Sequence, residues 1–472
     1  FHHTNDYWSM TAGEPCQPPQ LNFPASGSAA HTQPIHIVDL WRAEGGYEGP
    51  ARLFNNTCVA PEPAGGRPEQ CKPGPRGDEW FGGYEDSLFE QQVLRTVESH
   101  DASVPLFLLW APHAIHSPLQ LPDVWMRKFD FISPTDKPAH QRQRYHAMTH
   151  LADRMVGNLT SALKAKRMWH KLLLIFSSDN GGPVYYHGSA GANNYPLRGG
   201  KMSNWEGGIR SNAFVSGGLV PLSLRGSKYD GLVTLWDWYA TFSSLAGIDP
   251  TDHRAARAGL PPIDSYDMSQ VMLGLNLTSP RTEIPIGTDP SPSNLSSAPP
   301  CSSYDKTPYY HDAHPTLPAH GKCTTVSGLI VDEGTGGLWK LLTGDVHQAV
   351  YTGLHFPNSS TDELSQSFVS HCANGCLYNL KEDPLERHDL SEKMPSRLRK
   401  LHLKLEEYEA TAFNPHRGSI DPLACEYAVG KYGAQGHEFG DAIAARSYLT
   451  GQAYTQNKWR SEGTVVGAQL ER

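Results

Sequence analysis

Two short, continuous apolar runs frame the first half of the chain, over residues 104–110 and 171–177. Runs of this length that end in turn-forming residues are typical of strands buried on both faces of a parallel sheet. Between them, apolar residues recur every three or four positions from about residue 140 to 166, which predicts an amphipathic helix. The pattern therefore predicts a strand, helix, strand unit with a right-handed crossover.

Five further elements follow from the same kind of pattern. Helical spacing of apolar residues predicts helices over residues 86–100 and 395–410. A short apolar run predicts a strand over residues 212–216, and residues 328–344 indicate two strands around a glycine turn. Strands mixed with helices along the chain indicate an α/β fold.

A Pro/Ser-rich stretch at residues 289–304 is typical of a linker or a long surface loop. We therefore expect a large domain over residues 1–285 and a smaller carboxyl-terminal domain over residues 286–440. Residues 441–472 show no strong periodicity and are expected to form an extension.

Charge and hydropathy exclude several classes of function. The 472 residues include 40 Lys and Arg against 49 Asp and Glu, a net charge of −9, which disfavours nucleic acid as a partner. No apolar run approaches the roughly 20 residues of a membrane helix, so no membrane span is expected. No signal peptide is recognisable in the printed sequence. Nothing in the sequence indicates an oligomeric state.

The eight cysteines are spread widely and lack the CxxC spacing of zinc sites, which favours disulfides. Five Asn-x-Ser/Thr sequons indicate a glycoprotein. They begin at Asn55, Asn158, Asn276, Asn294 and Asn358. Both features predict a secreted or lysosomal protein.

Candidate chemistry begins where the second apolar run ends, in the segment FSSDNGG. Asp179 and Asn180 offer the hard oxygen ligands that Ca²⁺ or Mg²⁺ takes; the alternative is a simple Asx turn. Lys201, in PLRGGKMSNWEGGIR, offers a positive charge to an anionic group. A phosphate-binding P-loop is excluded, because Tyr195 and Met202 stand where that motif needs Gly and Ser or Thr.

Two histidines follow the first apolar run, in APHAIHSPLQLP. An imidazole can exchange a proton near neutral pH, so His113 and His116 are candidates for acid/base work. Ligands of open α/β sheets bind outside the carboxyl ends of the strands. We therefore expect these histidines to approach Asp179 and Asn180.

The segments IHSPLQLP, FSSDNGG, NNYPLRGGK, WEGGIR and LYNLKEDPLERHDLS, in this order, resemble those of the type I, formylglycine-dependent sulfatases, and most of all the arylsulfatase B-like branch. The resemblance implies an alkaline-phosphatase-like sandwich, in which helices flank a central, mostly parallel sheet. A smaller carboxyl-terminal α+β domain would complete this fold. It also implies a hydrolase for sulfate esters of sugars or aryl alcohols.

The resemblance assigns roles to four residues. Asp179 and Asn180 would bind a metal, usually Ca²⁺, with Mg²⁺ as the alternative. Lys201 would bind the sulfate oxygens, and His116 would contact sulfate and protonate the departing alcohol, with His113 as the competing choice. These two residues would thus serve both substrate binding and catalysis.

Three residues outside this set are expected to be structural. Glu206 and Arg210 in WEGGIR are expected to form an ion pair or backbone anchor that holds the loop of Lys201. Glu386, in the carboxyl-terminal block, is expected in a solvated turn together with His388 and Asp389.

The family's nucleophile signature, Cys/Ser-x-Pro-x-Arg, is absent: Cys16 and Cys71 lack the arginine at the required position. The sequence also contains no Asp-Asp dipeptide, which supplies the family's first metal ligands. We therefore expect an amino-terminally incomplete sulfatase, with formylglycine in the missing segment. Such a chain would expose a sheet edge, bind metal weakly and turn over slowly or not at all.

Two alternatives remain. One is a noncatalytic sulfatase-like protein that binds sulfated glycans. The other is a phosphodiesterase of the same superfamily, but those sites pair two zinc ions, whereas Asn180 after Asp179 favours a single hard cation.

Overall fold

The computed structural model describes residues 41–44, 47–50, 84–117, 119–132, 137–184, 190–293, 322–357 and 369–412. The chain divides into two compact units, each described by itself below. The first unit comprises residues 1–132, 143–168 and 414–472, and the second comprises residues 133–142 and 169–413. The domain boundaries expected near residues 285 and 440 stay predictions.

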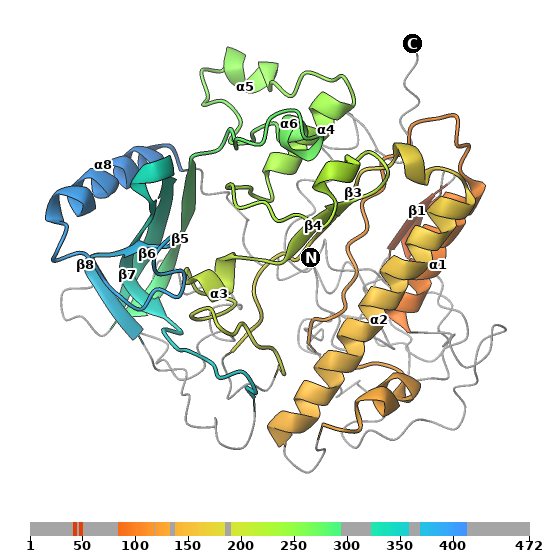
Figure 1. Ribbon diagram of the computed structural model, residues 1–472, viewed down its shortest axis with the longest axis horizontal. Coiled ribbons are helices and arrows are strands. Elements are labelled where there is room, and N and C mark those ends of the chain that lie inside the picture. Colours follow the sequence, from red (N-terminus) through yellow and green to blue (C-terminus); the bar gives the residue numbers. More distant parts are fainter. Residues whose placement is uncertain are drawn as a thin grey trace, which may run out of the picture. The chain divides into compact units, whose positions relative to one another are not determined.

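Two helices organise the first unit (Figure 1). They are α1, Glu85–Ser99, and α2, Lys137–Ala165, and both confirm the predicted helices. Apolar residues of α2 pack with the segment before α1 and the 3₁₀ helix η2, Asp123–Phe129. The buried members are Tyr84, Leu119, Leu121, Trp125, Ala147, Met148, Leu151 and Met155. The hairpin of β1, Trp41–Glu44, and β2, Tyr47–Pro50, also belongs to this unit.

The strand predicted over residues 104–110 is wrong. This segment forms no strand in the structure, and Phe107 and Leu109 are 58% and 78% exposed. A continuous apolar run becomes a buried strand only when neighbouring strands and helices cover it. The predicted strand, helix, strand unit therefore does not form among the described residues.

In the second unit, β3, Leu174–Ser177, pairs with β4, Ala213–Ser216, in an antiparallel ladder. These are the predicted strands of residues 171–177 and 212–216. Phe176 and Phe214 stack across the ladder with ring centroids 5.0 Å apart. One short helix, α3, Glu206–Ile209, lies between these strands in the chain, and three more follow β4: α4, Asp237–Leu245; α5, His253–Arg257; and α6, Ser269–Met272.

A four-stranded antiparallel sheet forms the carboxyl-terminal part of the second unit (Figure 1). Its strands, in spatial order, are β5, Glu283–Ser293; β6, Lys322–Asp332; β7, Leu338–His347; and β8, Val369–Asn379. The β6–β7 hairpin confirms the predicted turn, and α8, Pro395–Thr411, confirms the predicted helix.

Alternation along β7 gives this sheet two different faces. Trp339 and Leu341 pack with Leu401 and Leu405 of α8 on one face. Leu342 packs with Trp205, which precedes α3, on the other. Lys340 alternates with Trp339 and Leu341 and is directed toward the α3 side, where it meets Glu206. The sheet therefore connects α8 to the segment that carries Lys201.

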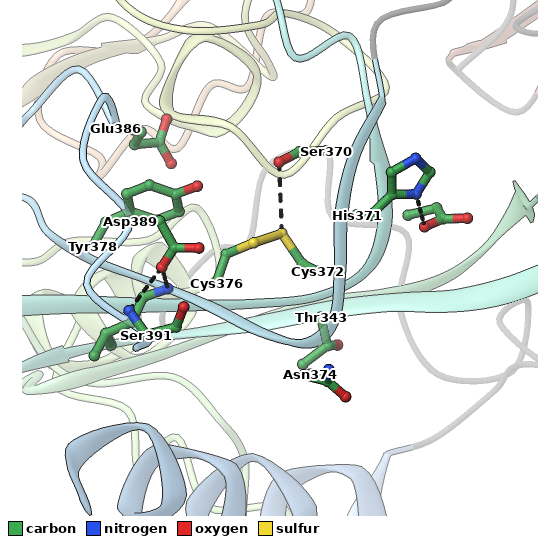
Figure 2. Close-up of a disulfide and its surroundings, with 12 residues drawn as sticks. Thr343, Ser370, His371, Cys372, Asn374, Cys376, Tyr378, Glu386, Asp389 and Ser391 are labelled. Atoms are coloured by element: carbon green, nitrogen blue, oxygen red, sulfur yellow. Dashed lines mark hydrogen bonds and ion pairs between the residues drawn. A yellow bond between two sulfur atoms is a disulfide. The ribbon is translucent and has the colours of Figure 1, made fainter. Parts of the chain in front are cut away.

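One disulfide lies in β8, between Cys372 and Cys376, and confirms the disulfide prediction for this pair (Figure 2). Both residues are buried, next to Tyr378 in the apolar cluster of the α3 face. Asp389 accepts hydrogen bonds from the backbone N–H groups of Leu377, 3.0 Å, and Ser391, 2.9 Å (Figure 2). Asp389 thus orders the chain after β8.

Mixed helices and sheets fit the predicted α/β class. Every strand pair among the described residues is antiparallel, so the central parallel sheet stays a prediction. Within the described ranges, no helix is both long and apolar enough to cross a membrane.

Candidate active site

The turn after β3 carries Asp179 and Asn180. The Asn180 N–H donates to Asp179 Oδ1 at 2.8 Å, and Ser178 Oγ donates to the Asn180 carbonyl at 2.9 Å. Asp179 is exposed and Asn180 is half-buried. One carboxylate oxygen of Asp179 is therefore held against the backbone of the turn, and the dipeptide lies at the surface of the second unit.

This turn packs directly on residues 196–210, which we call the lysine loop. The Gly181 N–H donates to the Gly208 carbonyl at 2.9 Å, and the Lys201 N–H donates to the Gly182 carbonyl at 3.1 Å. A Cβ on Gly181 would lie 1.7 Å from the carbonyl oxygen of Gly207. Only glycine permits so close an approach of two backbones. The glycines of FSSDNGG and WEGGIR thus bring the two motifs together.

Two amide side chains fix the backbone around Lys201. The Asn194 side chain accepts from the Gly182 N–H at 2.8 Å and donates to the carbonyls of Gly182, 2.7 Å, and Gly199, 3.0 Å. Gln348 Nε2 donates to the Lys201 carbonyl at 2.7 Å. The base of the lysine side chain is therefore held from both sides.

The Lys201 ammonium is half-buried and lies close enough to Asp179 to interact with its charge. Burial lowers the pKa of Lys201, and the negative charge of Asp179 raises it in part, so that the pKa remains below its ordinary value. A cation that has lost part of its hydration attracts an anionic ligand more strongly than a fully exposed one. The structure thus brings Asp179 and Lys201 together.

A buried cluster of three charged residues anchors the lysine loop to β7. Lys340 is 0% exposed, and its Nζ lies 2.9 Å from Glu206 Oε1 and 2.7 Å from Glu386 Oε1. The Glu206 N–H also donates to Glu386 Oε2 at 2.8 Å. The predicted anchoring role of Glu206 is confirmed, with the more exposed Arg210 at 4.0 Å.

The solvated turn expected around Glu386 is wrong for Glu386 itself, which is fully buried. Its carboxylate can be buried because the Lys340 ammonium and a backbone N–H compensate its charge. The sequence could not show the burial of Glu386, because its partner Lys340 lies 46 positions away, in β7.

Within this cluster, burial and the neighbouring opposite charge shift the pKa of each residue in opposite directions. Burial lowers the pKa of Lys340, but the charges of Glu206 and Glu386 together raise it by more, so the pKa is raised. Burial raises the pKa of Glu386, and the Lys340 charge only partly opposes that effect. With one buried ammonium between two carboxylates, the lysine is strongly held in its charged form.

Trp205 fills the space beside this cluster. Its side chain is fully buried, and Nε1 donates to the His347 carbonyl at 3.0 Å. The Arg198 guanidinium lies 3.7 Å from the centroid of the Trp205 ring and donates to the Glu386 carbonyl at 3.2 Å. The lysine loop is therefore held to the sheet by an aromatic side chain as well as by charge.

In the first unit, two buried carboxylates at the start of α1 hold residues 111–117, which we call the histidine loop. Asp86 accepts from the backbone N–H groups of His113, 3.0 Å, and Ala114, 2.9 Å. Glu85 Oε2 lies 2.9 Å from His113 Nδ1. His113 Nδ1 is thus engaged by a buried carboxylate at the start of α1.

His116 follows on the same loop. The His116 backbone N–H donates to the His113 carbonyl at 2.9 Å, and the ring Nδ1 of His116 lies 2.6 Å from the Ser117 carbonyl oxygen. Because a carbonyl oxygen only accepts, Nδ1 carries the hydrogen in this contact. Nε2 is then the nitrogen whose protonation can change. His116 belongs to the first unit and Lys201 to the second, so their convergence stays a prediction.

Asp86 titrates in an unusual range. Burial raises its pKa from 3.8 to about 6, although the hydrogen bond from the His113 backbone opposes the shift. The nearby charge of Glu85 raises the pKa further, and that of His113 lowers it. The main support of the histidine loop therefore takes up a proton only slightly below neutral pH.

The described residues supply only part of a metal site. Asp179 and Asn180 have the oxygen donors that Ca²⁺ prefers, but two side chains do not fill its roughly six to eight coordination positions. No group of three or more His, Cys, Asp or Glu side chains that could hold a metal occurs within the described ranges. These residues therefore fit the ion in the type of donor atom but not in the number of ligands.

Sequence reasoning missed four residues that support the site. Glu85 and Asp86 open a predicted helix, where acidic residues are expected for their effect on helix stability alone. Lys340 interrupts the apolar run of LWKLL, and a lone charge in a buried strand is a signal that could have been used. Nothing in the sequence distinguishes Gln348.

Comparison with known proteins places these observations in a family. The Sulfatase family model matches residues 36–248, a segment that contains His116, Asp179, Asn180 and Lys201. Mouse arylsulfatase J is 32% identical over 348 residues, which cover 72% of this chain and 51% of that protein. Over this segment the chain is similar to the sulfatases.

Other relatives match shorter stretches. Dog N-acetylgalactosamine-6-sulfatase is 30% identical over 193 residues, which cover 40% of this chain and 33% of that protein. The solved structure of Ps i-CgsB shares 22% identity at a TM-score of 0.46, over 69% of this chain and 55% of that one. The chain spans about half the length of arylsulfatase J and a third of the galactosamine sulfatase.

Proposed function

We propose that the protein to which this chain belongs hydrolyses sulfate esters. The observation that carries the proposal is the lysine loop, which fixes a half-buried ammonium beside Asp179 through backbone contacts and a buried charge cluster. A preorganised, partly desolvated cation is suited to an anionic group that gains charge on its oxygens during transfer. The loop also lies within the segment that matches the sulfatases.

Each proposed role rests on one side chain. Lys201 binds the sulfate oxygens and offsets charge on them as the bond between sulfur and the ester oxygen breaks. His116 Nε2 gives a proton to the departing alcohol oxygen, and overall the oxygen of a water molecule replaces the ester oxygen on sulfur, so that alcohol and sulfate are the products. No residue of this sequence is assigned as the nucleophile, since the Cys/Ser-x-Pro-x-Arg signature is absent from it. We therefore expect negligible turnover by the 472-residue chain alone.

Asp179 and Asn180 are proposed as two ligands of a calcium ion, with magnesium as the alternative. When bound, such an ion would supply positive charge close to the sulfate oxygens. Calorimetric titration of the 472-residue chain with CaCl₂ should show weak binding that Asp179→Ala abolishes. Tight binding that survives this substitution would remove both residues from the proposed ligand set.

We propose a sulfated sugar as the substrate class, and the secretory pathway or lysosome as the location. The name of the related N-acetylgalactosamine-6-sulfatase supports the sugar, and the five sequons support the location. Sugar specificity depends on loops around the site, so the individual sugar is not assigned.

The deciding experiment uses the protein expressed from its complete reading frame and an aryl sulfate such as 4-nitrophenyl sulfate. Lys201→Ala should lower kcat/KM about 10²–10³-fold, which is typical for loss of one charge-stabilising group. Lys228→Ala, which removes an exposed lysine of the same unit, should leave it unchanged. If Lys201→Ala retains full activity, the proposed role of the lysine loop is wrong.

A noncatalytic glycan-binding protein is the second candidate, because the printed sequence lacks the nucleophile signature. It predicts that the complete protein binds sulfated oligosaccharides in a Lys201-dependent manner but hydrolyses none of them. The phosphodiesterase alternative predicts instead that a phosphate diester is hydrolysed and an aryl sulfate is not.

A further inference from the structure

Two of the five sequons are the same tripeptide in different structural settings. Asn158 and Asn276 both begin the sequence Asn-Leu-Thr, so the sequence alone gives them equal standing as glycan acceptors. The other three sequons lie outside the described residues. Any difference between these two sites must therefore come from the fold.

Asn158 lies inside α2 and takes part in packing against α1. Its Nδ2 donates to Glu90 Oε1 at 2.7 Å, and the other oxygen of Glu90 pairs with Arg154 Nη2 at 3.1 Å. Glu90 is only 6% exposed, so this carboxylate depends on both partners. A sugar on Asn158 Nδ2 would enter the contact between the two helices and disturb a buried charge.

Asn276 lies in an exposed turn of the second unit, a few residues after α6. Residues 274–278 are all exposed. The Asn276 backbone N–H donates to the Gln270 carbonyl at 3.2 Å, and Asn276 Oδ1 accepts from the Thr278 N–H at 3.0 Å. The backbone and the carbonyl side of the amide are therefore fixed, while Nδ2 has no hydrogen-bond partner among the described residues.

The surroundings of Asn276 also favour a covering group. Leu275 and Leu277, on either side of it, are 68% and 56% exposed. An attached oligosaccharide is bulky and hydrophilic, and it would shield these side chains from contact with other molecules. The turn thus presents an accessible acceptor next to apolar surface.

We propose that Asn276 carries an N-linked glycan when the chain is made in the secretory pathway, whereas Asn158 in the folded chain does not. In this transfer a bond forms between Asn276 Nδ2 and C1 of the first sugar. The bond from C1 to the diphosphate oxygen of a lipid-linked oligosaccharide donor breaks, the lipid diphosphate leaves, and Nδ2 loses one proton.

The test directs the 472-residue chain to the endoplasmic reticulum of cultured animal cells with a heterologous signal sequence. The protease-resistant fraction of the secreted chain is treated with peptide N-glycosidase in H₂¹⁸O, which labels each formerly glycosylated Asn, and its peptides are analysed by mass spectrometry. The Asn276 peptide should be labelled in most molecules, and the Asn158 peptide in few or none.

Matched variants provide the control. Thr278→Ala destroys the sequon of Asn276 and should remove one glycan from the secreted chain. Thr278→Ser keeps that sequon and should retain the glycan. Thr160→Ala destroys the sequon of Asn158 and should leave the number of glycans unchanged. An unlabelled Asn276, or an Asn158 labelled as fully as Asn276, would overturn the proposal. Because occupancy is measured without any substrate, the result is independent of whether the protein hydrolyses sulfate esters.

Discussion

The lysine loop and the histidine loop are both held by buried carboxylates, but the carboxylates are compensated differently. In the lysine loop, Glu206 and Glu386 share the ammonium of Lys340. In the histidine loop, Asp86 accepts hydrogen bonds from two backbone N–H groups, and its pKa rises to about 6. A full charge supports the lysine loop and a pair of backbone N–H groups supports the histidine loop, so the two arrangements should respond differently to mutation and to pH.

The largest effect is expected for Lys340→Met. The substitution leaves two carboxylates buried without their cation, which should lower the free energy of unfolding by about 3–5 kcal/mol. Urea denaturation near neutral pH measures this loss. Lys228→Met, at an exposed position, should change the free energy by less than about 0.5 kcal/mol.

A triple variant sharpens this test. Adding Glu206→Gln and Glu386→Gln to Lys340→Met removes the uncompensated charges and should regain part of the lost stability. A loss below about 1 kcal/mol in the single variant would mean that the cluster does not anchor the lysine loop energetically.

Unlike the lysine loop, the histidine loop should make the stability of the fold depend on pH through Asp86. Since the pKa of Asp86 is about 6 in the fold and 3.8 ordinarily, the folded chain binds more protons than the unfolded chain between these values. Stability therefore falls as the pH rises through this window, by on the order of 3 kcal/mol for this group.

Asp86→Asn lacks this titration and provides the comparison. The free energy of unfolding of the unmodified chain, minus that of Asp86→Asn, should decrease between pH values of about 4 and 7. If this difference stays constant with pH, Asp86 does not titrate as its burial implies.

A smaller effect is expected within the lysine loop, where Gly207 packs on the residues just before Lys201. A Cβ on Gly207 would lie 2.3 Å from the Gly199 carbonyl oxygen and 2.5 Å from that of Arg198. Backbone atoms cannot move aside easily, so Gly207→Ala should cost about 1–3 kcal/mol. Gly353→Ala is the control, because nothing lies within 4 Å of a Cβ there. Equal stability of the two variants would contradict this close packing within the lysine loop.

Periodicity predicted the helices α1, α2 and α8 and several strands, but not the short helices α3 to α6. The stripes of α1, α2 and α8 are long enough that the apolar face alone defines each helix. Residues 104–110 failed for a physical reason: a continuous apolar run records only that a segment could be buried, not that neighbouring strands are present to bury it.

The site could be predicted only in part. The lysine loop and the Asp179 turn were found because their motifs are compact in sequence. The pairing of Lys340 with Glu206 was not found, since it joins residues 134 positions apart whose meeting depends on the sheet. Motifs therefore identified the chemistry, and tertiary structure was needed to identify what holds it.

The two faces of β7 make the position of Lys201 depend on strand pairing far from the loop itself. Lys340 is paired with Ile330 of β6 and Tyr378 of β8. If β7 slipped by one residue, Lys340 would point to the apolar face that packs on α8, and Leu341 would point to Glu206. The length of the glycine turn between β6 and β7 therefore determines which side chain of β7 reaches Glu206 and Glu386.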